Sequence, residues 1–447
     1  MKKEYDVIVA GGGPSGINAA IAASRMGYRT LLIERYGFLG GMSTAALVYP
    51  WMTFHNHQGK QVIRGIAEEI VTRLVNIGAS PGHVRDTIGF VYSVTPYKTE
   101  EFKMVVLEML EEAGCDLLLH SLTEEVTVED NKITSLTIVG KSGREQLSAS
   151  VFIDCTGDGD LAYAAGVPMQ YGREGDRLTQ PMTMKFRLSG VDLETVRDYL
   201  LEHKDQFYHK TLFNELEEGL PLTAVQGFYD IWEKAGLPIN RDHVLFFTGP
   251  GPDEVLINCS RVQGYKGTDS WELTEAEKEG RRQIAMLVKF FKESVPGFEN
   301  AVLSSTATQI GVRETRRIEG EYILTKEDVV AGSKFLDCIA KSAYPIDIHD
   351  PATKSISVAF IGGDGVFDIP YRCLLAKKVD NLLAAGRCIS TTHEAFATTR
   401  LTPSAMATGQ AAGTAAALSL LKGVLPKELS IKDLQEQLLK DDVFLGT

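Results

Sequence analysis

The sequence predicts an α/β fold with a parallel sheet, because strand, helix and strand signals follow one another near the N-terminus. An apolar run over residues 5–10 predicts a buried strand. An alanine-rich segment that stops at Gly27 predicts a helix, and a second apolar run then ends at the acid Glu34. Strands that alternate with helices in this way are typical of parallel sheets.

The turn between the first strand and the helix carries a glycine motif. Gly11, Gly13 and Gly16 have the G-x-G-x-x-G spacing of nucleotide-binding turns. The first glycine permits a tight turn, the second lets backbone amides approach a pyrophosphate, and the third lets helix and strand pack closely. Pro14 suits the first turn of a helix whose N-terminus attracts phosphate, and Glu34 follows at the distance expected of a ribose-binding acid. The segment therefore predicts a Rossmann-like dinucleotide site.

Three further blocks, at 36–44, 151–160 and 381–387, follow in an order that resembles the FAD-dependent oxidoreductases. That family shares its fold with p-hydroxybenzoate hydroxylase and the succinate dehydrogenase flavoprotein, and it includes the flavin subunits of heterodisulfide reductases. Its pattern continues through 309–318 and the C-terminal helix, so the resemblance spans nearly the whole chain. It implies a Rossmann-like FAD-binding domain with a β-meander crossover and an inserted α+β substrate domain.

The expected FAD-binding domain covers 1–166 and 370–447, and the expected substrate domain covers 167–369. In the first, the sequence predicts a helix at 101–112, a third parallel strand at 115–120, meander strands at 124–128, 132–139 and 145–150, a returning strand at 151–154, a strand at 381–384, and a long final helix from the N-cap Thr402 to Gly423. In the second, it predicts strands at 182–188 and 255–258 and helices at 194–203, 226–235 and 274–294.

The resemblance implies that FAD is held without a covalent link. Ser43 and Thr44 lie near the loop in which a flavin-linked histidine would stand, and His55 and His57 come well beyond it. The residues implied to bind FAD are Gly11, Gly13, Pro14, Ser15, Gly16, Glu34, Arg35, Gly41, Met42, Ser43, Thr44, Val126, Thr156, Gly157, Asp158, Gly386, Arg387, Ser404, Ala405 and Met406.

Some of these residues have a specific role in the resembled fold. The backbone near Val126 touches the adenine, and free amides of Ser404, Ala405 and Met406 face the pyrimidine edge of the flavin. A helix N-terminus at that edge stabilises the negative charge of reduced flavin. Arg387 stands where relatives carry an acid that bonds ribitol, so either it contacts the pyrophosphate or backbone groups hold the ribitol.

The main candidates for substrate binding are Arg400 and His393, seven residues apart just before the C-terminal helix. In the succinate dehydrogenase group, a histidine and an arginine at this spacing grip a substrate carboxylate, and the planar guanidinium suits that role. Arg400 therefore faces either substrate or flavin. The alternatives are an ion pair between Arg400 and Glu394 and a packing role for His393.

Arg313 and His349 are further candidates for the catalytic site. Arg313 begins a basic cluster over 313–317 and either lines the substrate pocket or joins an ion-pair network. His349 is a candidate general acid or base that Asp347 or Asp350 could orient, although a polar loop explains the same residues.

Composition excludes several other classes of protein. A net charge of −13 and an isoelectric point near 5.3 count against nucleic acid and against an anionic membrane surface. The six cysteines form no C-x-x-C pair, which counts against a metal site, an Fe–S cluster or a redox dithiol and fits a reducing compartment. We expect a cytoplasmic protein with no membrane span and no metal.

We expect an oxidoreductase that moves a hydride between flavin N5 and a small, carboxylate-bearing organic substrate. A flavin-dependent monooxygenase or oxidase is the alternative, although the spaced Ser and Arg of the hydroxylase pattern do not follow Asp158. A non-redox or RNA-modifying flavoprotein is a third reading, against which the acidic charge counts. A second nucleotide-binding glycine motif is missing from the sequence, so the electron partner is unidentified.

Overall fold

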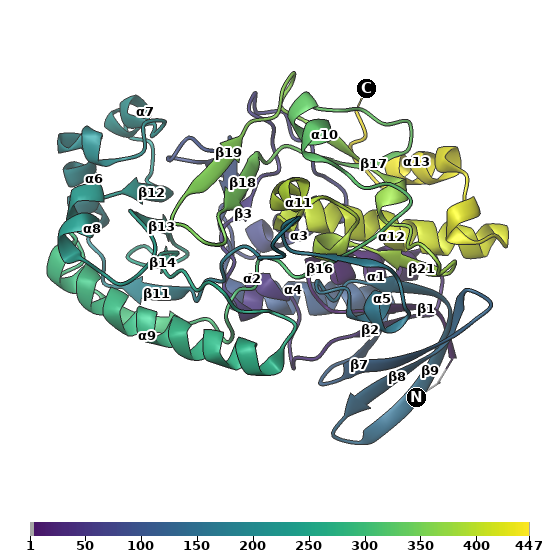
Figure 1. Ribbon diagram of the computed structural model, residues 1–447. Helices are drawn as coiled ribbons and strands as arrows, with labels where there is room; N and C mark the ends of the chain where they lie inside the picture. The colour runs from purple at the N-terminus through teal and green to yellow at the C-terminus, as the bar shows by residue number, and fades with distance from the viewer. Residues whose placement is uncertain (1–3, 447) are drawn as a thin grey trace.

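The computed structural model describes residues 4–446 and contains the predicted parallel sheet (Figure 1). Its strands follow the order β6-β2-β1-β9, and β21 pairs with the C-terminal half of β9. All of these pairings are parallel. The strands are β1 (Glu4–Ala10), β2 (Thr30–Ile33), β6 (Asp116–Leu118), β9 (Gly143–Asp154) and β21 (Leu382–Ala384). The α/β prediction is therefore confirmed.

Helices α1 (Pro14–Arg25) and α12 (Thr402–Lys422) pack against each other beside this sheet (Figure 1). Two glycines of α12 make the close approach possible. A Cβ on Gly409 or Gly413 would lie 2.1 Å from a backbone carbonyl oxygen of α1. The contact joins the glycine turn at the start of α1 to the N-terminal part of α12.

The β-meander forms from β7 (Leu122–Glu129), β8 (Lys132–Gly140) and the first half of β9. Separate strands at 145–150 and 151–154 were expected, but β9 is one strand. Its residues 143–147 pair with β8, and its residues 148–154 pair with β1. No glycine or proline interrupts 144–154, so the chain changes partners without a turn.

A second sheet contains five strands in the order β12-β13-β14-β11-β15. Part of the helix expected at 226–235 is wrong, because 224–227 pairs with β13 and the helix begins only at Tyr229. The sheet and the helices beside it (Figure 1) are β11 (Phe186–Ser189), β12 (Ala224–Gly227), β13 (Val244–Thr248), β14 (Val255–Ile257), β15 (Val302–Thr306), α6 (Leu193–Glu202), α7 (Phe213–Glu217), α8 (Tyr229–Ala235) and α9 (Ser270–Ser294). The domain boundaries at 167 and 369 stay predictions.

The C-terminal region differs from expectation in two details. Thr402 is the first residue of α12 rather than its N-cap, and Leu401 takes the extended N-cap conformation. Gly423 ends α12 in the left-handed conformation, as predicted, with φ +65°. The helix is not the last one, because α13 (Ile431–Lys440) follows it.

Shorter elements connect the two sheets. They are α2 (Met42–Ala45), β3 (Trp51–Met52), α3 (Ile66–Asn76), β4 (Val84–Arg85), β5 (Ser93–Thr95), α4 (Thr99–Glu112), α5 (Asp160–Ala164), β10 (Met169–Tyr171), β16 (Arg316–Ile318), α10 (Lys326–Ala331), β17 (Cys338–Ser342), β18 (Ile346–His349), β19 (Ile356–Ala359), β20 (Phe367–Pro370) and α11 (His393–Thr399).

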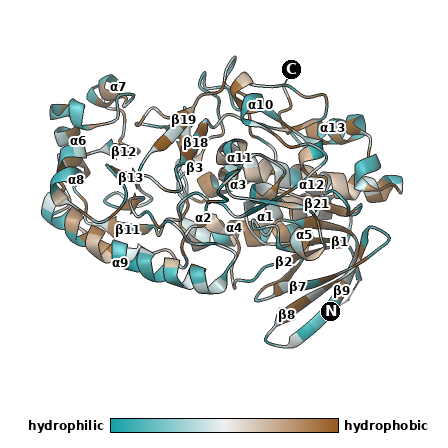
Figure 2. Ribbon diagram, in the orientation of Figure 1, coloured by the Kyte–Doolittle hydropathy of each residue, from teal (hydrophilic) through white to brown (hydrophobic). Residues whose placement is uncertain are grey.

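The hydropathy of the elements matches their packing (Figure 2). Along α9, hydrophilic and hydrophobic residues alternate, and the buried ones, such as Ile284, Leu287 and Phe291, recur at helical spacing. Across residues 4–446, every helix is too short or too polar to cross a bilayer.

Candidate active site

The three motif glycines of the turn after β1 differ in the free space around them. A Cβ on Gly11 would lie 2.5 Å from the Cys155 carbonyl oxygen, and one on Gly16 would lie 1.8 Å from the Gly11 carbonyl oxygen. A Cβ on Gly13, in contrast, would meet only Gly41 Cα at 3.8 Å. Gly11 and Gly16 are therefore fixed by packing, and open space lies beside Gly13 at the start of α1.

Glu34 lies next to the same turn. Its Oε2 accepts a hydrogen bond from the Gly12 amide at 2.7 Å, and its Oε1 accepts one from the Tyr36 amide at 2.9 Å. Burial raises the pKa of this carboxyl, although the two amides oppose the shift. Open space beside a glycine turn, a helix N-terminus and a buried acceptor together fit a dinucleotide with its pyrophosphate and ribose.

Arg387 is already bonded within the protein. Its Nη2 donates to Asp158 Oδ1 at 2.5 Å, and its Nη1 donates to the Val312 carbonyl. Thr315 Oγ1 donates to the same Asp158 oxygen at 2.6 Å. These bonds connect the turn after β9 to the segment 312–315. Only part of the Arg387 guanidinium is therefore left to bind a cofactor.

Several other predicted FAD-binding residues have internal partners. Thr44 Oγ1 donates to the Leu39 carbonyl at 2.8 Å, and Ser43 Oγ accepts from Trp51 Nε1 at 3.2 Å. Thr156 Oγ1 donates to Asp154 Oδ1 at 2.8 Å. These hydroxyls shape the loops around the nucleotide site.

One of the expected cofactor contacts needs correction, and another stays a prediction. The Ser121 amide donates to the Glu34 carbonyl at 3.1 Å, just before β7 begins. Val126 lies five residues further along the chain in β7, and its contact with the adenine stays a prediction. The Ala405 amide is not free, because it donates to the Leu401 carbonyl at 2.9 Å, and Met406 lies one residue deeper in α12.

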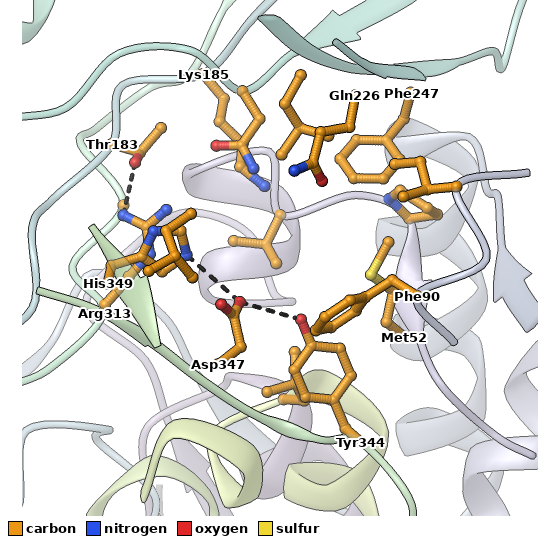
Figure 3. A pocket seen from close by; sticks show the side chains of 18 of the residues that line it. Met52, Phe90, Thr183, Lys185, Gln226, Phe247, Arg313, Tyr344, Asp347 and His349 are labelled. Atoms are coloured by element: carbon orange, nitrogen blue, oxygen red, sulfur yellow. Dashed lines mark hydrogen bonds and ion pairs between the residues drawn. The ribbon is translucent and has the colours of Figure 1, made fainter. Parts of the chain in front are cut away.

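A cavity of about 560 Å³ lies between the N-terminus of α12 and the second sheet. From the α12 side, its lining includes Met42, Arg387, Arg400 and Thr402. From the segments that precede β11 and β16, and from β18 with the residues before it, the lining includes Lys185, Arg313, Tyr344, Asp347 and His349, whose side chains point into it (Figure 3). Three of the four predicted catalytic residues, Arg400, Arg313 and His349, therefore line one cavity.

His393 is the exception. It is not among the residues that line the cavity, and its Nδ1 lies 2.9 Å from Glu314 Oε1. Glu314 Oε1 also accepts from Arg317 Nη1 at 2.5 Å. The three buried side chains form an internal network. The contacts of His393 therefore fit the packing role given above as an alternative.

Arg400 projects into the cavity with little support from the protein. Its Nε is buried without a hydrogen-bond partner, and burial lowers the pKa of the guanidinium. Among residues 4–446, the ion pairs do not include one between Arg400 and Glu394; nearby ion pairs join Arg387 to Asp158 and His393 to Glu314. The Arg400 charge therefore lacks a carboxylate partner in direct contact.

Within the described part of the chain, residues 4–446, the hydrogen-bond partners of Arg313 are neutral. Its Nη1 donates to the Pro181 carbonyl at 2.5 Å and to Thr183 Oγ1 at 2.6 Å (Figure 3). Burial, with the charge of Arg400, lowers its pKa to about 9. The ion-pair network expected as an alternative is formed instead by its neighbours Arg316, with Asp160, and Arg317.

Asp347, rather than Asp350, is the partner of His349. Their Nε2 and Oδ2 atoms are 3.4 Å apart, and the Tyr344 hydroxyl lies 3.3 Å from the same oxygen (Figure 3). Burial, reinforced by Arg313, lowers the pKa of His349 to about 3 despite Asp347. Burial opposes ionisation of Asp347, but His349, Arg400 and Arg313 hold its pKa below its ordinary value. The pair is a neutral imidazole beside a carboxylate.

Lys185 is a cavity residue that the sequence reasoning missed. Only 8% of it is exposed, and burial, followed by Arg313 and Arg400, lowers its pKa to about 7. The signal was present in the segment 182–188, where Thr183, Lys185 and Arg187 alternate with apolar residues. Alternation places these three side chains on one face of an extended segment.

Comparisons with known proteins identify the family of this chain. The family model described as FAD dependent oxidoreductase matches residues 6–438. The chain is 28% identical over 245 residues to the tRNA uridine 5-carboxymethylaminomethyl modification enzyme MnmG 1 of Fusobacterium nucleatum. This alignment covers 49% of this chain and 36% of that protein. It is 58% identical over 38 residues, 8% of this chain and 7% of the relative, to leghemoglobin reductase of Vigna unguiculata.

These alignments span 36% of the first relative's length and 7% of the second's. Among solved structures, the flavin-dependent brominase Bmp2 is similar in fold, with a TM-score of 0.52, 13% identity, and coverage of 95% of this chain and 81% of that chain. The family match covers nearly the whole chain, and the glycine turn and Glu34 fit the cofactor. The chain therefore belongs to the FAD-dependent oxidoreductase family, and its cofactor is FAD.

Proposed function

We propose that this oxidoreductase transfers a hydride between FAD and a small organic acid bound in the cavity. One observation carries the proposal: Lys185, Arg313 and Arg400 line the cavity, and none of them forms an ion pair with a carboxylate among residues 4–446. Buried cations without a counter-charge are costly, and an anionic ligand removes that cost. FAD, when bound, supplies the hydride acceptor or donor.

In this proposal the cations bind and orient the carboxylate. Arg400 and Arg313 each present a planar guanidinium, which suits a carboxylate better than a point charge does. On another side of the cavity, Met52, Phe90 and Phe247 form an apolar wall (Figure 3). That wall holds the body of the substrate and excludes water.

The pair of His349 and Asp347 supplies the proton chemistry. With Nε2 directed at Asp347, the neutral imidazole has Nδ1 available to accept a proton from a substrate hydroxyl or amine. The cations that depress the pKa of His349 are the ones that an anionic substrate would neutralise. Substrate binding therefore raises the basicity of His349 when a base is needed.

The other readings have less support. RNA modification is suggested only by the partial similarity to the tRNA-modifying relatives, and the net charge of −13 counts against an RNA partner. The similarity to the brominase, at 13% identity, supports a shared fold but says nothing about a shared reaction.

The test is the reactivity of the reduced protein with oxygen. The FAD-loaded protein is photoreduced without oxygen, mixed with air, and followed by flavin absorbance. Reoxidation over minutes is expected of a dehydrogenase or reductase. Complete reoxidation within the mixing time would instead favour an oxidase or monooxygenase and overturn the proposal.

A further inference from the structure

The second sheet presents a row of side chains to the cavity. Gln226 pairs with Leu245, and the Asn258 amide donates to the Leu245 carbonyl at 2.9 Å. Lys185 directly precedes Phe186, which pairs with the residue before Asn258. The side chains of these four neighbouring residues all line the cavity. The row, which runs across β12, β13, β14 and β11, is Gln226, Leu245, Asn258 and Lys185.

Arg241 lies toward the other side of this sheet from Arg313. The cavity-lining residues His243, Leu245 and Phe247 alternate along β13 and the residue before it, and Arg241, two residues before His243, also lines the cavity. Phe246 and Phe186 both pair with Ile257, which puts Thr183, the partner of Arg313, level with His243. Because β14 separates β13 from β11, the two chain segments are roughly 10 Å apart at this level.

Arg241 is held rigidly and lacks a counter-charge in direct contact. Its Nε donates to the His243 carbonyl at 2.8 Å, and its Nη2 lies 2.8 Å from His243 Nε2. His243 Nδ1 in turn lies 2.6 Å from Asp242 Oδ1, which fixes the tautomer that can accept from Arg241. Arg241 is 7% exposed, and within residues 4–446 its Nη1 has no hydrogen-bond partner.

A second hollow adjoins the cavity at this point. Tyr229, Arg241, Asp242 and Lys354 line both spaces, whereas Arg313 and Arg400 line only the first. Arg241 therefore marks the end of the cavity that is remote from α12, and Lys354 adds a second positive charge there. The wall between the two cationic ends includes the apolar Leu245 and Phe247.

We infer that Arg241 forms a second anion subsite and that the substrate carries two anionic groups, roughly 10 Å apart, joined by an apolar body. The inference rests on the proposed function, because the first anionic group is the carboxylate held by Arg400 and Arg313. A mono-anion held by Arg400 and Arg313 would leave the buried Arg241 guanidinium without a counter-charge in direct contact.

The test compares two homologous series of probes. Straight-chain α,ω-dicarboxylates of four to ten carbons and the monocarboxylates of the same lengths are titrated into the FAD-loaded protein, with flavin absorbance as readout. We expect one dicarboxylate length to bind at least ~10-fold more tightly than its monocarboxylate, since a charge-assisted hydrogen bond contributes about that factor. Equal affinities at every length would overturn the inference even without any variant.

Substitutions then locate the second subsite. Arg241→Gln should abolish the dicarboxylate advantage and leave monocarboxylate affinity within about twofold. Arg282→Gln, at an exposed position of α9, is the control that should change neither. An equal loss for both series in Arg241→Gln would indicate a structural role and contradict the inference. Monocarboxylate binding that depends on Arg400, without a dicarboxylate advantage, would refute the second subsite alone; binding of neither series would refute the proposed function as well.

Discussion

At the residue scale, the cavity is defined by an excess of buried positive charge. Arg313 and Arg400 lower the pKa of Lys185, Arg400 lowers the pKa of Arg313, and Asp347 is a buried carboxylate near both arginines. Such an arrangement destabilises the ligand-free protein and favours an anion. Binding and stability should therefore respond in opposite directions to substitutions here.

Arg400→Lys should keep the charge but lose the planar fork. Loss of a bidentate charged contact costs about 2–4 kcal/mol, so the affinity for a monocarboxylate should fall roughly 30- to 1000-fold, with FAD still bound. Flavin absorbance titration measures the affinity, and the flavin content of the purified variant is the control. Wild-type affinity in the lysine variant would show that Arg400 does not hold the carboxylate.

Lys185→Met should weaken carboxylate binding yet stabilise the ligand-free protein by about 1–4 kcal/mol, because it removes a buried unpaired cation. Thermal unfolding without ligand measures the second effect. A variant less stable than the wild type would mean that the ammonium has a partner in the native protein.

Lys185 also predicts a pH dependence. Its pKa is lowered from 10.5 to about 7 in the folded protein, so between these values the unfolded chain binds more protons and stability rises with pH. Carboxylate affinity should move the other way and fall roughly 10-fold from pH 6 to pH 9, as the ammonium loses its proton. Both trends should vanish in Lys185→Met, and a wild-type affinity independent of pH over this range would contradict the assignment.

At the element scale, the crossing of α1 and α12 positions the site. Gly409→Val should destabilise the protein by about 3 kcal/mol and reduce its FAD content, because the side chain would collide with the Ser15 carbonyl. Leu421→Val places the same β-branched residue at an exposed position of α12 and should cost less than about 0.5 kcal/mol. Equal stability of the two variants would show that α12 can move away from α1 without loss.

Some helices and strands were predictable from the sequence, and others were not. The glycine turn, α1 and the C-terminal end of α9 were predictable because local signals, such as Gly27 and the helical spacing of buried residues, agree with the tertiary packing. The start of α9 was expected at 274, but the helix begins at Ser270, after the N-cap Asp269. Strand β12 was not, since its pairing with β13 overrides the local helical pattern of 226–235.

Part of the candidate site was predictable from the sequence, and part was not. Arg400 was found from its place before α12 and Arg313 from its basic cluster. Lys185 and Arg241 carry no motif, and they reach the cavity from the segments before β11 and β13, in a sheet whose pairing cannot be read locally. For His393 the sequence left substrate binding and packing as alternatives, because its partner, Glu314, lies 79 residues away in the chain.

At the scale of the whole molecule, the cavity proposed to hold the substrate lies where the parallel sheet with α12 meets the second sheet and the β18–β19 hairpin. The purified protein should be yellow, and acid precipitation should release the flavin into the supernatant, as expected of a non-covalent cofactor. Gly13→Leu should abolish FAD binding, because its side chain would fill the open space at the start of α1. Full flavin content in that variant would place the pyrophosphate elsewhere.

The central claim is that the cations of the cavity hold an organic acid beside FAD. The most direct measurement is a crystal structure of the FAD-loaded protein soaked with hexanoate. We expect the carboxylate within about 2.7–2.9 Å of guanidinium nitrogens of both Arg400 and Arg313, with the alkyl chain against Met52 and Phe90. A carboxylate bound away from both arginines, or an Arg400 guanidinium bonded to FAD instead, would contradict the account.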